Sequence, residues 1–207
     1  MESVAFASCY VYSPAGVGEV CERSRLLREL LKSGDEQFLL KYAVRVHQQA
    51  TQSTQLAGFF GAADVLVPVP GCSTQSCGRW VAAGLADALV REGLGAISWR
   101  GLHRIRAVQK SATAGVAARP SVRLHYESFS MERAPREMGS VMLIDDVITK
   151  GRTILAAAAR VREILPGARI RAFALVRTMG LIPTISRLVN PCIGEILWVR
   201  GDATRIP

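Results

Sequence analysis

Short apolar runs alternate with longer amphipathic segments along most of the chain, and the two patterns predict different elements. Short apolar runs bounded by Gly, Pro, Ser or Asp are typical of buried strands. They lie at residues 3–12, 65–70, 96–99, 141–145 and 169–176. Apolar residues at helical spacing instead predict amphipathic helices. These segments lie at residues 23–34, 35–49, 77–92 and 154–165.

From residue 64 onward, predicted strands and helices alternate, which is the order of a mostly parallel sheet flanked by helices. Residues 102–120 hold several Arg and Lys among small residues without an apolar period, so we predict a mobile loop there. The alternating residues 122–131 predict a strand that returns from this loop. No internal repeat or linker is present, and we therefore expect a single α/β domain.

The composition indicates a globular domain and limits the cellular compartments in which we expect it. Of the 207 residues, 49% are hydrophobic, which is enough for a core of ordinary size. No run approaches the roughly 18 apolar residues that a membrane span needs. Glu2 stands where a secretory signal carries positive charge. The five cysteines are scattered without a CxxC pair, which disfavours a disulfide framework or a zinc site. We therefore expect a cytoplasmic protein with no membrane partner.

The net charge of +9 has two interpretations. It favours either attraction to nucleic acid or a site for a small polyanion on a generally basic surface. Because the arginines are spread along the chain without a dense basic block, nucleic acid is the less favoured of the two partners.

The segment VMLIDDVITKGRT, residues 141–153, carries the clearest chemical pattern. Two adjacent acids, Asp145 and Asp146, end an apolar strand, and ligands of open α/β sheets bind at that edge. The turn at residues 149–153 then opens a helix. Its N–H groups and threonine hydroxyls, helped by the helix dipole, predict an anion cradle.

The side chains of this turn suit a phosphate. Gly151 lets the backbone approach an anion closely, while Lys150 and Arg152 add positive charge beside the hydroxyls of Thr149 and Thr153. The two acids would repel a phosphate that touched them, so we expect them to accept hydrogen bonds from hydroxyl groups. A sugar phosphate satisfies both halves of the pattern.

The same segment resembles the signature with which type I phosphoribosyltransferases bind phosphoribosyl pyrophosphate (PRPP). That signature is an apolar run, two acids, two spacers and a Thr-x-Gly-x-Thr loop, and every position is filled here. The resemblance implies that Asp145 and Asp146 bind the ribose 2′ and 3′ hydroxyls, and Mg²⁺ through water. It implies that residues 149–153 hold the 5′-phosphate. The alternative is a βα turn in which the acids only cap the helix.

A second segment, VLVPVPGCSTQS at residues 65–76, resembles the first core strand and pyrophosphate loop of the same family, particularly its ComF-like branch. The pyrophosphate-binding residues that this implies are Pro70, Gly71, Cys72, Ser73 and Arg79. Because Pro70 has no N–H, the backbone donors come from the residues after it. Taken alone, the segment is also typical of an ordinary strand-to-helix turn capped by Ser73 or Thr74.

The predicted basic loop lies where members of the family carry a flap over the site. Arg104, Arg106 and Lys110 are therefore candidates for contacting pyrophosphate, and the alternative is a solvated basic loop. We expect His47 and His125 to be structural or exposed.

The resemblance covers residues 64–180 and implies a type I phosphoribosyltransferase-like core. The cysteine-ligated zinc finger and the Arg-Gly-Phe-Asn sequence of many ComF-like proteins are both missing. Residues 1–63 are interpreted as an N-terminal helical appendage of the same domain, and residues 181–207 as a C-terminal hood or tail. Trp198 is interpreted as a packing residue.

The activity that the resemblance implies is transfer of 5-phosphoribose from PRPP and Mg²⁺ to a nitrogenous base or amine, with release of pyrophosphate. Since a fold does not fix a function, two alternatives stay open. One is a PRPP-sensing regulator or nucleic-acid-associated module without turnover. The other is a structural subunit that uses the fold for assembly, and a homodimer is among the partners considered.

Overall fold

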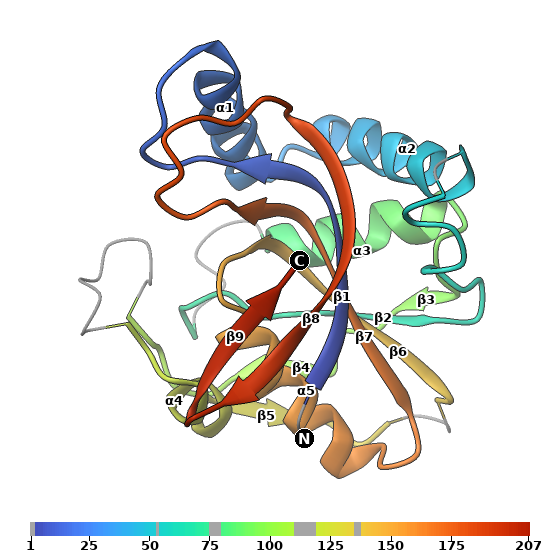
Figure 1. Cartoon of the computed structure of the whole chain (residues 1–207). Helices are drawn as coiled ribbons and strands as arrows, with labels where there is room; N and C mark the ends of the chain where they lie inside the picture. The colour runs from blue at the N-terminus through green and yellow to red at the C-terminus, as the bar shows by residue number, and fades with distance from the viewer. Residues whose placement is uncertain (1–2, 53, 75–79, 110–118, 135–137) are drawn as a thin grey trace.

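The computed structural model describes residues 3–52, 54–74, 80–109, 119–134 and 138–207. At its centre is a seven-stranded sheet with the strand order β3–β2–β6–β7–β1–β8–β9 (Figure 1). Its strands are β1 (Ser3–Tyr12), β2 (Val65–Pro68), β3 (Ile97–Ser98), β6 (Ser140–Ile148), β7 (Arg169–Thr178), β8 (Val189–Val199) and β9 (Asp202–Ile206). The pairs from β3 to β1 are parallel, whereas β8 and β9 are antiparallel to their neighbours. The predicted α/β class with a mostly parallel sheet is confirmed.

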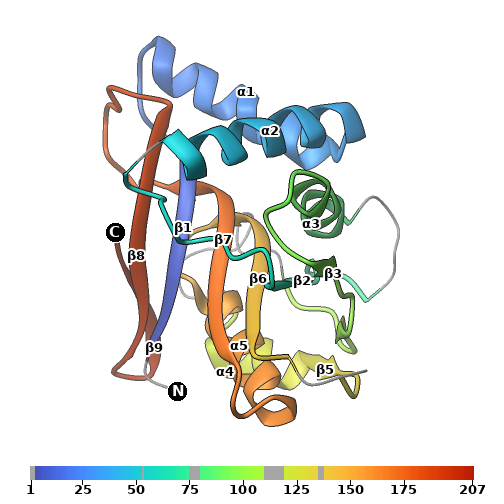
Figure 2. The ribbon, with the colours of Figure 1, turned by 90° about the vertical axis from the view of Figure 1, so that its right-hand side faces the viewer.

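Helices cover both faces of the sheet. They are α1 (Glu19–Ser33), α2 (Glu36–Gln52), α3 (Val81–Arg91), α4 (Val122–Ser128) and α5 (Arg152–Ile164). Helices α1, α2 and α3 lie together on one side, with α5 and α4 on the other (Figure 2). Successive side chains of β6 alternate between the two layers: Leu143 belongs to the core that includes Ile154 of α5, and Ile144 to the core that includes Leu85 of α3.

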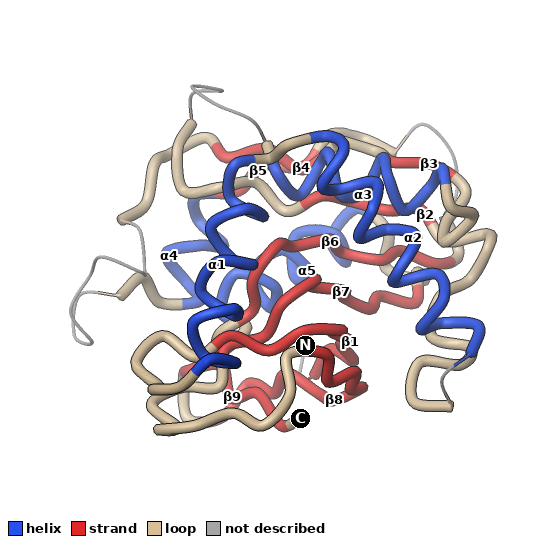
Figure 3. The backbone as a smooth tube through the Cα atoms, turned by 90° about the horizontal axis from the view of Figure 1, so that it is seen from above, coloured by secondary structure: helices blue, strands red, loops and turns tan. Residues whose placement is uncertain are grey.

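The N-terminal residues are an integral part of this sheet, so their interpretation as an appendage is corrected. Strand β1 lies between β7 and β8, as the row of strands in Figure 3 shows. Leu31 of α1 and Leu39 of α2 are buried in the core on one face of the sheet. The apolar run at residues 3–12 is therefore an inner strand, which is why most of it is buried.

The C-terminal residues also belong to the sheet. Strands β8 and β9 form an antiparallel hairpin that extends it beyond β1, so these residues are the edge of the sheet rather than a hood or tail. Trp198 lies on β8 and is 43% exposed, which does not fit a packing residue. Within the described residues, no helix is both long and apolar enough to span a membrane.

The predicted strand at residues 122–131 is wrong over most of its length. Residues Val122–Ser128 form helix α4, and only β5 (Phe129–Met131) is extended, where it pairs antiparallel with β4 (Leu102–Arg104). The hydroxyl of Ser121 accepts a hydrogen bond from the Leu124 N–H and so caps the helix. The buried residues of α4 follow the spacing of a helix, although the apolar letters alternate. The cap and this spacing outweigh the alternation.

Candidate functional site

The chain passes from β6 into α5 at a position that only glycine can occupy. Gly151 has a φ of 87°, in the left-handed region, and a Cβ atom there would lie 2.5 Å from a methyl carbon of Ile196 on β8. Its carbonyl accepts the Leu155 N–H at 2.9 Å, which starts the helix. No side chain caps α5, and no acidic residue lies in its first turn. The N–H groups of that turn, which have no partner within the helix, are therefore suited to an anion.

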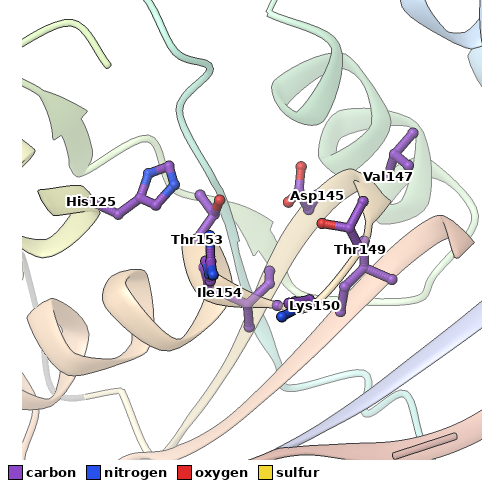
Figure 4. A pocket seen from close by; sticks show the side chains of 10 residues that line it. His125, Asp145, Val147, Thr149, Lys150, Thr153 and Ile154 are labelled. Atoms are coloured by element: carbon purple, nitrogen blue, oxygen red, sulfur yellow. The ribbon is translucent and has the colours of Figure 1, made fainter. Parts of the chain in front are cut away.

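A small cavity opens above this turn (Figure 4). Its volume is about 40 Å³. Since a water molecule needs about 10–15 Å³, the cavity admits a group of several heavy atoms. The lining residues come from α4, β6, the turn and the first residues of α5: His125, Asp145, Val147, Ile148, Thr149, Lys150, Gly151, Arg152, Thr153 and Ile154. All five predicted phosphate-binding residues, 149–153, are thus brought together with Asp145.

The two acids face different surroundings. Successive residues of a strand point to opposite sides. Asp145 lines the cavity, and its Oδ1 accepts the Asp146 N–H at 2.8 Å. Asp146 is only 8% exposed, and its Oδ2 accepts a hydrogen bond from Nζ of Lys32 on α1. Asp146 is not among the residues that line the cavity, so the prediction that both acids face the turn is corrected: Asp145 does, and Asp146 binds Lys32.

The pKa of Asp145 is raised above its usual range. Burial is the main cause, and the negative charge of Asp146 adds to it, whereas Lys32 acts in the opposite direction. The positive charge near Asp145 is therefore too small to offset the cost of ionising its carboxyl group. A cation or hydroxyl donors bound beside it would favour its ionised form.

The cations at the rim of the turn are already paired with an acid from the C-terminal hairpin. Arg152 donates to both carboxylate oxygens of Asp202, with Nε–Oδ1 2.5 Å and Nη2–Oδ2 2.6 Å, and Nζ of Lys150 lies 3.4 Å from Oδ2. The hydrogen bond from Arg152 is the main reason that the pKa of Asp202 falls to about 2. Asp202 therefore stays ionised and offsets part of the positive charge expected at the cradle.

Arg104 braces the predicted pyrophosphate loop instead of pointing to a ligand. It is 7% exposed and donates to the carbonyl of Gly71, to the carbonyl of Pro70 at 3.3 Å and to Oγ of Ser128 at 2.5 Å. Its guanidinium also lies over the Phe129 ring. Burial lowers its pKa to about 10. The prediction that Arg104 is a flap residue in contact with pyrophosphate is therefore corrected.

The remaining predicted residues of the loop and flap are only partly placed. Cys72 is half-buried, and its carbonyl accepts the Val108 N–H at 2.9 Å. Ser73 and Arg106 are exposed. Arg79 and Lys110 lie outside the described residues.

His125 is a cavity residue that the sequence interpretation missed. It is 5% exposed, and its ring stacks on Phe129 with centroids 6.4 Å apart. Burial, followed by the positive charges of Arg104 and Arg152, lowers its pKa to about 4. The helix start at Ser121 is the signal that would have placed His125 on the buried side of a helix.

The fold and the site together define an α/β protein with a turn suited to an anion at the carboxyl edge of its parallel strands. The sequence matches no model of a known protein family and no curated protein.

Proposed function

We propose that this chain binds PRPP with Mg²⁺ and transfers 5-phosphoribose to a nitrogenous base or amine, releasing pyrophosphate. The observation that carries the proposal is the shared cavity of Asp145 and residues 149–153. One wall offers the open N-terminus of α5 to a phosphate, and another offers a carboxylate to hydroxyl groups. A phosphorylated pentose has both of these groups.

The loop at residues 70–73 supports a second anion subsite. In a trans peptide, the carbonyl of one residue and the N–H of the next point in opposite directions. Because the carbonyls of Pro70 and Gly71 accept hydrogen bonds from Arg104, the N–H groups of Gly71 and Cys72 point away from that guanidinium. Arg104 therefore orients backbone donors for pyrophosphate and does not contact pyrophosphate itself.

Mg²⁺ fits this site as part of its complex with PRPP. In the described part of the chain, no group of three or more His, Cys, Asp or Glu side chains could hold a metal. Mg²⁺ is usually held by one or two carboxylates together with substrate phosphates and several waters. Asp145 would supply such a carboxylate, through water. When bound, Mg²⁺ would neutralise the charge on the departing pyrophosphate.

The residues themselves would act by position and charge. The turn would fix the 5′-phosphate, the backbone donors of the second loop would orient the leaving group, and Asp145 would orient the ribose. Because pyrophosphate is already an activated leaving group, its departure needs no protein acid, and the proton displaced from the acceptor nitrogen would pass to the departing pyrophosphate or to solvent.

Calorimetry with PRPP and Mg²⁺ tests the binding step. We expect saturable binding by the wild-type protein and a loss of about 10- to 100-fold in affinity for Asp145→Asn, since a hydrogen bond to a charged group contributes about 1.5–3 kcal/mol. Asp87→Asn is the matched control because Asp87 lies on α3 in an exposed pair with Arg100. Its affinity should equal that of the wild type. Absence of PRPP binding by the wild type contradicts the proposal.

A screen of bases and amines for pyrophosphate release tests the transfer step. We expect release with at least one acceptor and none from Asp145→Asn. Binding of PRPP without release by any acceptor would instead support the non-catalytic sensor.

A further inference from the structure

The imidazole of His125 is buried at the cavity without satisfying its hydrogen-bonding capacity. Its Nδ1 is enclosed and has no hydrogen-bond partner among the described residues. Buried polar atoms without a partner are rare in native proteins. In Figure 4 the ring of His125 and the carboxylate of Asp145 are seen on either side of Thr153. The ring is thus next to the place where an anion at the α5 N-terminus would bind.

The backbone and neighbours of His125 hold the ring in this place. The His125 N–H donates to the carbonyl of Ser121 at 3.1 Å, and the hydroxyl of Ser128 donates to the His125 carbonyl at 2.6 Å. The ring stacks on Phe129.

The charges that face His125 come from each element around the cavity. Arg104 on β4 and Arg152 on α5 disfavour a positive charge on the ring. Lys150 of the turn and Asp145 on β6 line the same cavity, and Asp202 on β9 pairs with Arg152. Two cations and a buried position keep the imidazole neutral, so it has one N–H to donate and one nitrogen that accepts.

We propose that His125 is a phosphate-binding residue of this site, donating a hydrogen bond from its neutral imidazole to the phosphate that the α5 N-terminus holds. The inference rests on the proposed function, since it takes the bound group to be the 5′-phosphate of PRPP. A neutral donor completes the cradle without adding another charge beside Arg104 and Arg152. Its low pKa, about 4, is consistent with this neutral state at physiological pH.

Binding of ribose 5-phosphate to the wild type and three variants tests this role. His125→Phe keeps a flat ring for the Phe129 stack and removes the donor, so we expect its dissociation constant to rise by roughly tenfold. His125→Gln keeps a neutral donor and should recover part of that loss. His103→Gln is the matched control, because His103 is exposed and paired with Glu132 outside the cavity. Equal affinity of His125→Phe and the wild type overturns the inference.

Nuclear magnetic resonance of the wild type gives a second test, which does not depend on whether a variant folds. The chain has three histidines, so the ring nitrogen signals of His125 can be distinguished from those of His47 and His103. We expect ribose 5-phosphate to shift the His125 signals alone, and the shifted signals to remain those of a neutral ring from pH 6.5 to 8.5. Unchanged His125 signals at saturation, or signals of a protonated ring, overturn the inference.

The two proposals fail in different ways. If His125→Phe weakens ribose 5-phosphate binding but PRPP gives no pyrophosphate with any acceptor, the phosphate site stands and the transferase does not. If the wild type turns over PRPP while His125→Phe binds ribose 5-phosphate as the wild type does, only the role of His125 is wrong.

Discussion

Ionisable side chains that are buried or partly buried lie at both ends of the neighbouring strands β2, β6 and β7. At the amino end, Asp64 stands just before β2 and pairs with Arg171 of β7. At the carboxyl end, Asp145 and Asp146 are the sixth and seventh residues of β6. The same sheet therefore has an acidic site at each end, and the surroundings of the two sites differ.

The amino-end acid has every acceptor position used. Oδ1 of Asp64 accepts from Arg171 and from the Ser140 hydroxyl, both at 2.6 Å, and Oδ2 accepts from Arg171 at 2.7 Å and from the Gly61 N–H at 2.8 Å. At the carboxyl end, Asp145 accepts the Asp146 N–H and faces a cavity. A buried carboxylate whose acceptor positions are all used stabilises the fold, whereas an acid with unused acceptor positions can still bind a ligand.

Replacing Asp64 should have the largest effect on stability. Asp64→Asn leaves the buried guanidinium of Arg171 without its counter-charge, so we expect the free energy of unfolding to fall by about 3–5 kcal/mol. Urea denaturation measures this loss. Glu36→Gln is the control, because its pair with Arg91 is exposed and should contribute less than about 1 kcal/mol. A small loss of stability with a large loss of PRPP affinity would reverse the roles assigned to the two ends.

Replacing Asp145 should have a smaller effect of opposite sign. Its raised pKa in the folded state means that the folded protein loses stability as pH rises from about 4, where the unfolded acid ionises, through that raised pKa. Asn cannot ionise, so we expect Asp145→Asn to be about 1–2 kcal/mol more stable than the wild type at pH 8, and this difference to shrink toward pH 4.

Thermal or urea unfolding across this pH range measures the difference, with Asp87→Asn as an exposed acid that should show no such trend. A variant that gains stability while losing PRPP binding is expected where an acid is kept for function. If Asp145→Asn is less stable than the wild type at pH 8, Asp145 has the same structural role as Asp64.

The sequence predicts the difference between the two ends of the sheet only in part. Local pattern suffices to predict the sheet, the turn and the position of Gly151, because each of these features lies within one unbroken stretch of sequence: the apolar runs of β2, β6 and β7, and residues 141–153. The partners of the site come from distant segments: Lys32 reaches Asp146 from α1, and Asp202 reaches Arg152 from β9. The local spacing of apolar and polar residues does not predict which of these distant side chains come into contact.

The direction of individual side chains is also set by long-range packing. Arg104 appears in the sequence as one more cation of a basic loop, yet pairing of β4 with β5 places it over Phe129 and turns it inward. His125 was missed because residues 122–131 were predicted as a strand. A helix and a strand place a given residue on different faces, so the prediction did not put His125 on the buried side.

Replacing Asp202 should have the smallest of these effects, and the effect is on phosphate binding. It tests whether Arg152 and Lys150 act on a phosphate bound at the turn. Asp202→Asn frees Arg152 and Lys150 from their shared carboxylate, so we expect ribose 5-phosphate to bind about two- to fivefold more tightly at low ionic strength, with the gain lost at high salt because exposed charges are screened. The pKa of Asp202 is about 2, so the gain should not change between pH 6.5 and 8.5. Calorimetry over a salt series measures it, and an affinity that Asp202→Asn leaves unchanged at every salt concentration would mean that these two cations do not act on the bound phosphate.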